Sequence, residues 1–141
     1  MKVSIILQAK GFEVFSIASN ATVYDALVLM GKKNIGAVLV IDNHQLVGIL
    51  SERDYARKII LKGKTSHDTL VKEIMSVNAI TITAQESIDD CMNLMSQNHI
   101  RHLPVVENGI VLGMVSIGDV VKTIIQLQQD TIHHLQSYIL Q

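Results

Sequence analysis

The hydrophobic and polar positions of the chain form two matching pairs of apolar runs. The first pair spans about residues 36–41 and 46–50, and the polar turn DNHQ joins its two runs. The second pair spans about residues 101–106 and 111–115, and the turn ENG joins them. Apolar runs of this length, separated by short turn sequences, predict two β-hairpins.

A short strand and an amphipathic helix are predicted ahead of each hairpin. The strands are expected at Val14–Ile17 and at Ala79–Ile82. Thr22 and Ser87 then each begin a Ser/Thr-x-x-Asp sequence, which typically caps the start of a helix. Apolar residues follow at helical spacing, namely Val23, Ala26, Leu27 and Met30 in the first copy and Ile88, Cys91, Met92 and Met95 in the second.

These patterns make the chain a tandem repeat. Residues 34–60 and 99–125 align without a gap at an offset of 65 positions, and eight of the 27 aligned pairs are identical. We therefore predict an α+β protein built from two β-α-β-β-α repeats, with a second helix starting near Ser51 or Ser116. One repeat alone would expose a face of its sheet, whereas two repeats bury these faces against each other.

Helices are also predicted outside the repeats. KVSIILQA at the N-terminus is expected to be a short helix, and LVKEIMS precedes repeat two in the same way. The last residues, VVKTIIQLQQDTIHHLQSYIL, predict one long amphipathic helix with Ile125, Ile132, Leu135 and Ile139 near one face. That face needs a partner, either the chain's own domain or a second subunit. The predicted domains are repeat one with the N-terminal helix (1–64), repeat two with the linker helix (65–127) and the C-terminal helix as a dimer contact (128–141).

Composition narrows the class of protein. Hydrophobic residues make up 48% of the chain, charged residues 18% and aromatic residues 4%, with a net charge of −1. This predicts a packed globular protein without the basic field that nucleic acids require. The single cysteine, Cys91, excludes an intrachain disulfide and favours a reducing, cytoplasmic location. The chain has neither a signal-peptide core nor an apolar run long enough to span a membrane, so no membrane association is expected.

The motif GILSERD, Gly48 to Asp54, returns as GMVSIGD, Gly113 to Asp119, and it allows two interpretations. In one, the Ser hydroxyl and the Asp carboxylate only cap the following helix. In the other, the turn after the Gly presents free backbone amides to an anion, the Ser contacts a phosphate and the Asp accepts hydrogen bonds from a ribose diol. The residues alone leave both open.

Other reactive side chains do not form a recognisable catalytic or metal-binding pattern. Cys91 lies on the core face of a predicted helix and is interpreted as a small buried hydrophobe. His99 and His102, and the adjacent His133 and His134, lack the converging ligands of a metal site. No general base stands at a plausible position, so the protein is not expected to be an enzyme.

The segments IGAVLVIDNHQLVGILSERDYARKII and RHLPVVENGIVLGMVSIGDVVKTII resemble the two halves of a tandem CBS-domain pair, named for cystathionine β-synthase. The resemblance covers residues 1 to about 127 and is to the small stand-alone bacterial type. It implies repeats packed sheet to sheet about a pseudo-twofold axis, and pairs that form disc-like homodimers. It also implies clefts between the repeats for adenosine-containing ligands such as AMP, ADP, ATP, NAD or S-adenosylmethionine. The family motif, Gly-apolar-x-Ser/Thr-x-x-Asp, is intact in both copies.

The resemblance also implies roles for particular residues. Ser51 and Ser116 would contact phosphate, and Asp54 and Asp119 the ribose hydroxyls. The adenine pockets would be lined by the strand-entry residues, namely Ile35, Gly36, Ala37, Ile80, Arg101, His102, Leu103 and Pro104. Arg53, Arg101 and His102 are hypothesised to supply charge to the phosphates, whereas Arg57 is interpreted as a solvated surface charge. Because Gly118 replaces Arg53 in the second copy, two unequal sites are expected.

The predicted function is therefore non-catalytic: a regulatory or sensor module that binds an adenine nucleotide as a ligand and needs no cofactor. Its expected partners are a second copy of the chain and a separate regulated protein. The alternative is a protein-interaction or dimerisation module in which the nucleotide sites are vestigial and the Ser and Asp residues only cap helices.

Overall fold

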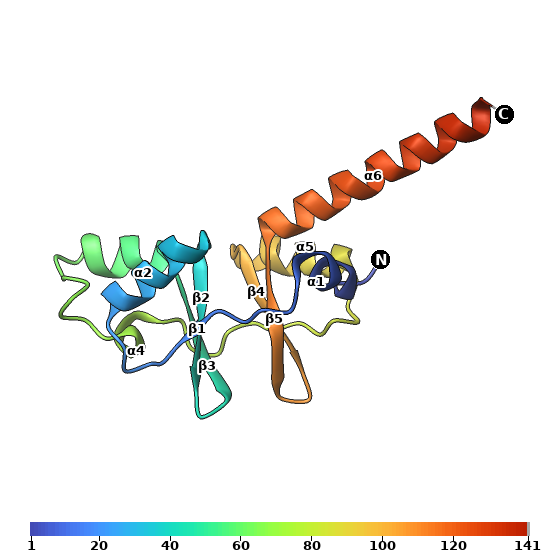
Figure 1. The fold of residues 1–141 in the computed structure, drawn as a ribbon. Coiled ribbons are helices and arrows are strands. Elements are labelled where there is room, and N and C mark those ends of the chain that lie inside the picture. Colours follow the sequence, from blue (N-terminus) through green and yellow to red (C-terminus); the bar gives the residue numbers. More distant parts are fainter. Residues whose placement is uncertain (141) are drawn as a thin grey trace.

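The computed structural model describes residues 1–140, and it places two similar units side by side (Figure 1). The first unit contains β1 (Ser16–Ile17), α2 (Val23–Lys33), β2 (Ala37–Asp42), β3 (Gln45–Ser51), α3 (Glu52–Tyr55) and a π-helical turn, η1 (Ala56–Ile60). The second contains α5 (Ile88–Asn98), β4 (His102–Glu107), β5 (Ile110–Ser116) and α6 (Ile117–Ile139). Two short helices, α1 (Ser4–Lys10) and α4 (Val71–Ile74), precede the units. The α+β tandem predicted from the sequence is confirmed.

The two hairpins have equivalent registers. Ala37 lies opposite Ser51 in the first hairpin, and His102 lies opposite Ser116 in the second. Both turns have positive φ angles at their two central residues, which are Asn43 and His44 in one and Asn108 and Gly109 in the other. Positive φ at both positions produces the tight turn whose twist matches that of the flanking strands, and Asn and Gly adopt it most readily. The turn sequences DNHQ and ENG therefore encode the hairpins locally.

The first strand of repeat two is much shorter than the sequence predicts. Only Ile82 of the segment Ala79–Ile82 joins the sheet, through a single parallel bridge to Val105. The amide of Ile82 donates to the carbonyl of Pro104 at 3.0 Å, and no regular strand forms in the described chain on either side of it. Ala79 and Ile80 instead line a cleft between the repeats, which takes them away from the edge of β4. The corresponding strand of repeat one is also short, because β1 contains only Ser16 and Ile17.

The helices that precede the hairpins are capped as predicted. The side chain of Thr22 accepts a hydrogen bond from the amide of Asp25 at 3.1 Å, and Ser87 accepts one from Asp90 at 3.0 Å. These bonds satisfy an amide that the first turn of a helix would otherwise leave unpaired. α2 and α5 therefore begin at equivalent places in the two repeats.

The two short helices pack in the opposite repeat from the one predicted. The sequence predicts that α1 belongs to repeat one, but its Ile6 and Leu7 are buried in the hydrophobic core of repeat two. Similarly, Val71 and Ile74 of α4 are buried in the core of repeat one. The backbone holds this exchange, since the amide of Val3 donates to Glu86 and that of Val71 to Ala21, both at 2.8 Å.

Close packing explains why each repeat accepts the other's helix. A Cβ atom on Gly48 would lie 2.8 Å from the carbonyl oxygen of Ser76, just after α4, and one on Gly113 would lie 3.1 Å from Leu7 of α1. The glycines of the repeated motif therefore admit a neighbouring segment of the chain. For this reason, the domain boundary predicted from the sequence, between residues 1–64 and 65–127, does not match the way the short helices pack in the two cores.

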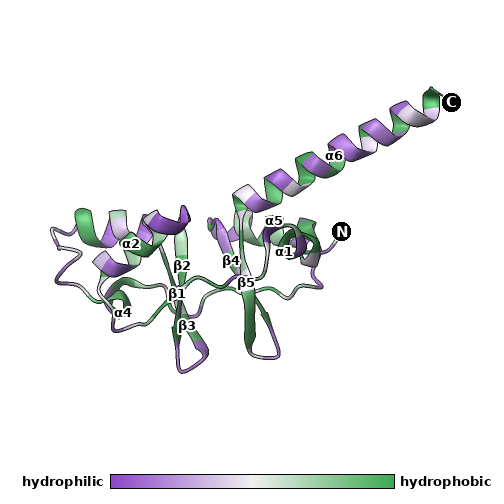
Figure 2. Ribbon diagram, in the orientation of Figure 1, coloured by the Kyte–Doolittle hydropathy of each residue, from purple (hydrophilic) through white to green (hydrophobic). Residues whose placement is uncertain are grey.

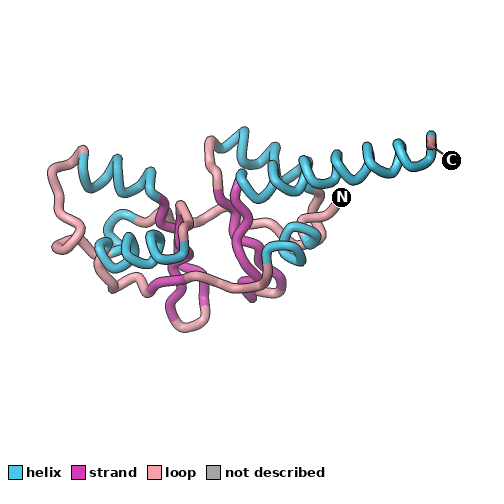
Figure 3. Tube along the Cα trace, turned by 45° about the horizontal axis from the view of Figure 1, so that its top comes forward, coloured by secondary structure: helices cyan, strands magenta, loops and turns pink. Residues whose placement is uncertain are grey.

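The two sheets face each other at the centre of the molecule, with the helices on the outside (Figures 1 and 3). β2 is buried on both of its faces. Val38 and Val40 pack in the core of repeat one, while Ala37 and Leu39 alternate onto the opposite face and are also fully buried. A strand buried on both sides has a continuous apolar run, which is the pattern the sequence shows here.

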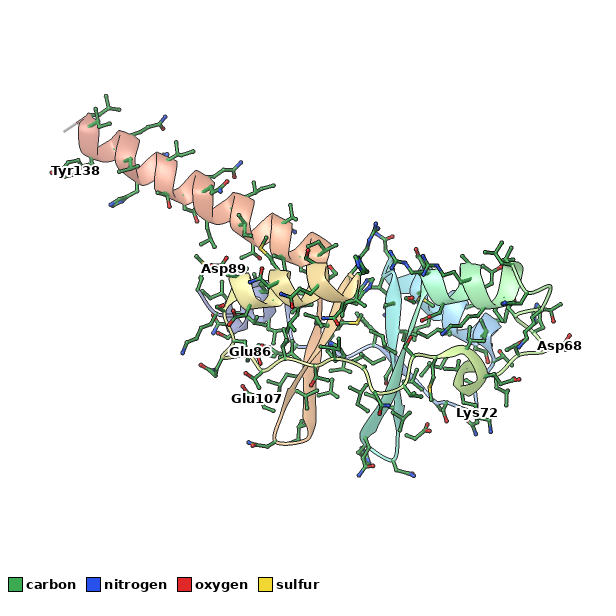
Figure 4. The ribbon with its side chains drawn as sticks, turned by 180° about the vertical axis from the view of Figure 1, so that it is seen from behind. Asp68, Lys72, Glu86, Asp89, Glu107 and Tyr138 are labelled. Carbon is green, nitrogen blue, oxygen red and sulfur yellow. The ribbon has the colours of Figure 1, made fainter. Side chains whose placement is uncertain are left out.

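α6 runs without interruption from repeat two into a long projection (Figure 1). It passes through residue 127, so the predicted boundary there does not coincide with the end of a helix. Bands of apolar and polar residues alternate along it (Figure 2), and Tyr138 marks its far end (Figure 4). The predicted apolar residues, Ile125, Ile132, Leu135 and Ile139, are all exposed. None of the described helices combines the length and the hydrophobicity that a membrane crossing requires.

Candidate functional site

A cleft of about 760 Å³ lies between the two repeats. Its walls come from the end of β3 with α3, the segment 76–80, the entry to β4 at 99–104 and the first residues of α6. Its volume falls within the range of sites that bind small molecules. The cleft therefore joins sequence segments that are far apart in the chain.

The cleft brings together most of the predicted ligand-binding residues. Those that line it are Gly36, Ser51, Arg53, Asp54, Ile80, Arg101, His102, Pro104 and Ser116. Four predicted residues do not line it. Ala37 and Leu103 are fully buried, and Ile35 packs against the core of repeat one. Asp119, the fourth, contacts a lysine outside the cleft.

The repeated Ser-x-x-Asp motif forms a complete helix cap in both repeats. In repeat one, the amide of Asp54 donates to the Ser51 hydroxyl at 3.2 Å, and the amide of Ser51 donates to the Asp54 carboxylate at 2.9 Å. In repeat two, the equivalent bonds between Ser116 and Asp119 measure 3.1 and 2.9 Å. Each cap uses one carboxylate oxygen, Oδ2, and leaves Oδ1 for another partner. The capping role is confirmed, and it does not exclude ligand binding.

The backbone amides at these helix starts are less available than the sequence predicted. The amide of Glu52 donates to the carbonyl of Gly36 at 3.0 Å, and that of Ile117 donates to the carbonyl of Arg101 at 2.9 Å. Together with the cap bonds, these contacts use the first and third amides of each helix. An anion in the cleft would therefore rely mainly on side chains.

The lining of the cleft is rich in cationic side chains. Four basic residues, Arg53, Arg57, Lys58 and Arg101, line it together with two acidic ones, Glu52 and Asp54. The labelled carboxylates Glu86 and Asp89 lie on the outer side of repeat two, away from the centre (Figure 4). The cleft thus has an excess of positive charge that favours a negatively charged ligand.

Arg57 and Lys58 were not expected in the site. The sequence favours a solvated surface charge for Arg57 and indicates no role for Lys58, but both side chains line the cleft. They follow Arg53 and Asp54 by four residues, and this spacing places side chains on the same side of a helix. Lys58 reaches both the Asp54 carboxylate, with Nζ 3.2 Å from Oδ1, and the carbonyl of Ile74 at 2.8 Å. The helical spacing was the signal that would have identified them.

Arg53 connects the two repeats across the cleft. Its Nη1 donates to the carbonyl of His99 at 2.7 Å, at the residue that ends α5. Gly118 occupies the equivalent position in repeat two and has no side chain to make such a contact. Arg53 therefore holds the entry to β4 as well as lining the site.

His102 faces Gly36 and is predominantly neutral at physiological pH. A Cβ atom on Gly36 would lie 3.4 Å from the imidazole ring, which shows how close the two strand entries are. Burial lowers the pKa of His102 below its ordinary value, and the cations of Lys10 and Arg101 lower the pKa further against the opposing effect of Asp119. The hypothesis that His102 supplies positive charge is therefore replaced by a neutral hydrogen-bonding ring.

Asp119 is paired with Lys10 of α1. Lys10 Nζ lies 2.7 Å from Asp119 Oδ2 and donates to the carbonyl of Met114 at 2.6 Å. Burial acts to raise the pKa of Asp119, but the hydrogen bonds from Lys10 and the Ser116 amide, together with the Lys10 charge, outweigh it and lower the pKa. Asp119 is therefore an ionised carboxylate that already has a cationic partner.

Cys91 and the histidines form no reactive cluster. Burial, with a smaller contribution from Glu86, raises the pKa of the Cys91 thiol to about 11, so the thiol stays protonated in the core. Within residues 1–140, no three His, Cys, Asp or Glu side chains converge in a way that would hold a metal ion.

Comparison with known proteins assigns this architecture to a described family. The family model for the CBS domain matches residues 10–61 and 71–126. The CBS domain-containing protein CBSX3, mitochondrial, from Arabidopsis thaliana is 42% identical over 123 residues, which cover 84% of this chain and 60% of that protein. The chain therefore spans somewhat less than two thirds of that relative.

Solved structures give the same result. A protein with CBS domains from Burkholderia ambifaria MC40-6 superimposes with a TM-score of 0.87 at 43% identity, covering 89% of this chain and 95% of that one. The CBS domain pair of protein MJ0100, in complex with 5′-methylthioadenosine and S-adenosyl-L-methionine, has a TM-score of 0.78 at 28% identity, covering 88% and 99%.

Proposed function

Because the chain belongs to the CBS-domain family, we propose that it is a non-catalytic regulatory module that binds a phosphorylated adenosine ligand between its repeats. The observation that carries the proposal is the cationic cleft that contains the Ser51–Asp54 motif. The MJ0100 pair binds adenosine-containing ligands, and this supports the adenosine part of the proposal.

The charge of the cleft favours nucleotides over the ligands of that neighbour. AMP, ADP, ATP and NAD carry negatively charged phosphates, which arginine binds through paired hydrogen bonds. S-adenosylmethionine has a positively charged sulfonium group, and 5′-methylthioadenosine has no charge. Four basic side chains against two acidic ones therefore select for the phosphorylated members of the class.

The proposed roles follow from position and chemistry. Asp54 accepts the ribose hydroxyls through Oδ1, the carboxylate oxygen that the cap does not use, in exchange for its contact with Lys58. Arg53, Arg57 and Arg101 bind the phosphates, and the apolar side chains of Ile80 and Pro104 contact the adenine ring. Lys58, once released from Asp54, becomes a further phosphate partner.

A ligand panel tests this function. We expect AMP, ADP, ATP and NAD to raise the melting temperature in thermal-shift assays and to give saturable heats in calorimetry, with S-adenosylmethionine much weaker. Arg101→Ala should lower nucleotide affinity roughly tenfold or more, since a hydrogen bond to a charged group contributes about 1.5–3 kcal/mol. Lys64→Ala, in the exposed linker, is the matched control that should change nothing. Equal affinity for AMP and S-adenosylmethionine would contradict the charge argument.

The complete helix caps favour a second candidate function. Ser51 and Asp54 satisfy each other without a ligand, as they would in a purely structural module. The two functions separate in the same assay. A protein-interaction module would bind no member of the panel, and Asp54→Ala would then change only the melting temperature.

We further propose that the chain forms a homodimer through α6 and acts on a separate protein. The row formed by Ile125, Ile132, Leu135 and Ile139 is exposed, and the nearby charges, Lys122 and Asp130, lie off it. An uncharged apolar row matches another copy of itself, because no charge is then buried without a partner. A single buried cysteine, Cys91, fits a reducing compartment such as the cytoplasm.

Light scattering tests the homodimer. Leu135→Glu places a charge in the row and should convert the dimer to a monomer, while Ser137→Glu, on the far side of the same helix, should leave the dimer intact. A monomeric wild-type chain at micromolar concentration would exclude this interface.

A further inference from the structure

One side of α6 carries a heptad repeat that runs from its first turn to its last. Its residues, here called the seam, follow one another at alternating spacings of three and four positions. This spacing is that of a coiled coil, in which the first and fourth residues of each heptad, the a and d positions, meet those of a partner helix. The a positions are Gly118, Ile125, Ile132 and Ile139, and the d positions are Val121, Gln128 and Leu135.

The seam is a different side of α6 from the one that packs on its own domain. Val120 is buried in the core of repeat two, and Ile124 packs against that core. Every residue of the seam is exposed, and Ile132 and Leu135 are each more than half exposed. The helix therefore has one apolar side that its own repeat covers and a second, the seam, that the described chain leaves open to a partner.

The residue types in the seam match a second copy of α6 that runs in the same direction. Isoleucine at the a positions with leucine at a d position favours two parallel strands. The positions that flank the seam carry one charged side chain, Lys122, so ion pairs between the strands cannot set their direction. The direction must therefore come from the seam itself.

Gln128 is the one polar side chain among the seven seam residues. In a parallel pair in register it faces its own counterpart, and two amide groups can bond to each other because each is both a donor and an acceptor. In an antiparallel pair that overlaps from Val121 to Ile139, a positions face d positions, and Gln128 would lie against Ile132. Its amide would then be buried without a partner, which is unfavourable.

We propose that α6 pairs with the α6 of a second copy as a parallel, in-register, two-stranded coiled coil whose register Gln128 sets. The inference rests on the homodimer of the proposed function and adds the direction and register of its strands. Ile117 and Gly118 line both the ligand cleft and an open groove at the base of the seam. A parallel pair therefore brings the two clefts of the dimer together at one end, with the projecting ends of α6 together at the other (Figure 1).

Disulfide cross-linking tests the direction, because Cys91 is buried and leaves an introduced cysteine as the reactive thiol. Leu135→Cys should form a disulfide between two copies in oxidised glutathione, since equivalent d positions meet in a parallel pair. Ser137→Cys, on the far side of the helix, is the matched control that should not cross-link. A mixture of Leu135→Cys and Ile125→Cys should give no mixed disulfide, because these positions are about 15 Å apart along a parallel coil and face each other in the antiparallel one.

A second cross-link leaves the seam unchanged. Leu140 lies just beyond α6 and is exposed. A short bismaleimide should join Leu140→Cys in two copies, because these ends meet in a parallel pair and lie about 30 Å apart in the antiparallel one. A mixed 125–135 disulfide without the bismaleimide product would overturn this inference and leave the homodimer standing. A monomeric chain in light scattering would overturn both, while the ligand panel decides nucleotide binding separately.

Gln128→Leu tests the residue that sets the register. Sedimentation equilibrium should show the dimer dissociation constant fall by about tenfold or more, because two leucine side chains become buried in place of two amides. The same change should allow the mixed 125–135 disulfide to form, since the amide no longer disfavours the antiparallel pair. Gln126→Leu, which lies off the seam, is the matched control for both readouts. A Gln128→Leu protein with the wild-type dissociation constant and no mixed disulfide would overturn the role of Gln128.

Discussion

The Ser51–Asp54 and Ser116–Asp119 regions have the same local structure and different surroundings. Both motifs close a cap with bonds of about the same length, and both follow a strand with the same register. The lysine beside Asp54 comes from the same helical segment, four residues later, whereas the lysine beside Asp119 comes from α1. Ser51 and Asp54 both lie in the wall of the cleft, whereas in the second motif Ser116 lines the cleft and Asp119 is tied to the N-terminal helix.

The difference shows what a duplicated sequence does and does not preserve. The residues that build a cap interact within one turn of the chain, so an internal copy preserves the cap. A ligand site also depends on segments from the other repeat and from the flanking helices, and these have diverged. The structure therefore retains two caps but places most of the predicted site residues in a single cleft.

The exchange of the short helices gives the largest expected effect. Leu7→Ala and Ile74→Ala each empty a nearly fully buried site, and each should lower the free energy of unfolding by about 2–5 kcal/mol. Hydrogen exchange should show where the loss falls. Leu7→Ala should reduce protection in β4 and β5, and Ile74→Ala in β2 and β3. The exposed neighbours Ile5 and Lys72 provide control substitutions to alanine. If Leu7→Ala instead reduced protection in β2 and β3, α1 would pack in repeat one, as the sequence predicts.

The two glycines of the repeated motif should differ in a smaller but measurable way. A methyl group at Gly48 meets the Ser76 carbonyl at 2.8 Å, and the backbone there is held by hydrogen bonds to Ile49, so Gly48→Ala should cost about 1–3 kcal/mol. A methyl group at Gly113 meets only the end of the flexible Leu7 side chain at 3.1 Å. Gly113→Ala should cost less than about 1 kcal/mol, because alanine also restricts the unfolded chain.

Urea unfolding measures both glycine variants. Neither glycine has a positive φ angle, so the difference reports on the packing alone. Equal losses of stability in the two variants would mean that the backbone at Ser76 moves to admit a methyl group as easily as the Leu7 side chain does.

Much of the fold could be predicted because its signals are local. The hairpin turns, the caps at Thr22 and Ser87 and the apolar runs of the strands each arise from residues close together in the chain. The repeat then doubled each signal. The strand predicted at Ala79–Ile82 does not form, because Ile80 lines the cleft instead. The residues next to Ile80 in the sequence could not indicate this position.

The remaining features depend on tertiary contacts that sequence patterns do not encode. α1 lies before repeat one in the chain, so its apolar face predicted burial without indicating which core would receive it. Lys10 reaches Asp119 across more than a hundred residues, and no pattern links them. The neutral state of His102 likewise depends on burial and on cations from two other places in the chain.

The smallest expected effect is a pH dependence centred on His102, the counterpart of Ala37 in repeat one. Its pKa in the folded protein is lower than its ordinary value of 6.5, so below about pH 6.5 the unfolded chain binds a proton that the folded chain does not. Stability should therefore fall as the pH falls through 6.5 and level off below the folded pKa. The charged groups that act on the ring are Lys10, Arg101 and Asp119.

Lys10→Met removes one of the two cations, so it should raise the pKa of His102 and flatten the change in stability between pH 7.5 and 5.5. His102→Asn should flatten it more, because burial is the larger cause. Urea unfolding of the three proteins at the two pH values isolates this group from the other histidines, which are common to all. A Lys10→Met protein with the full wild-type pH dependence would mean that the charge of Lys10 does not lower the pKa of His102.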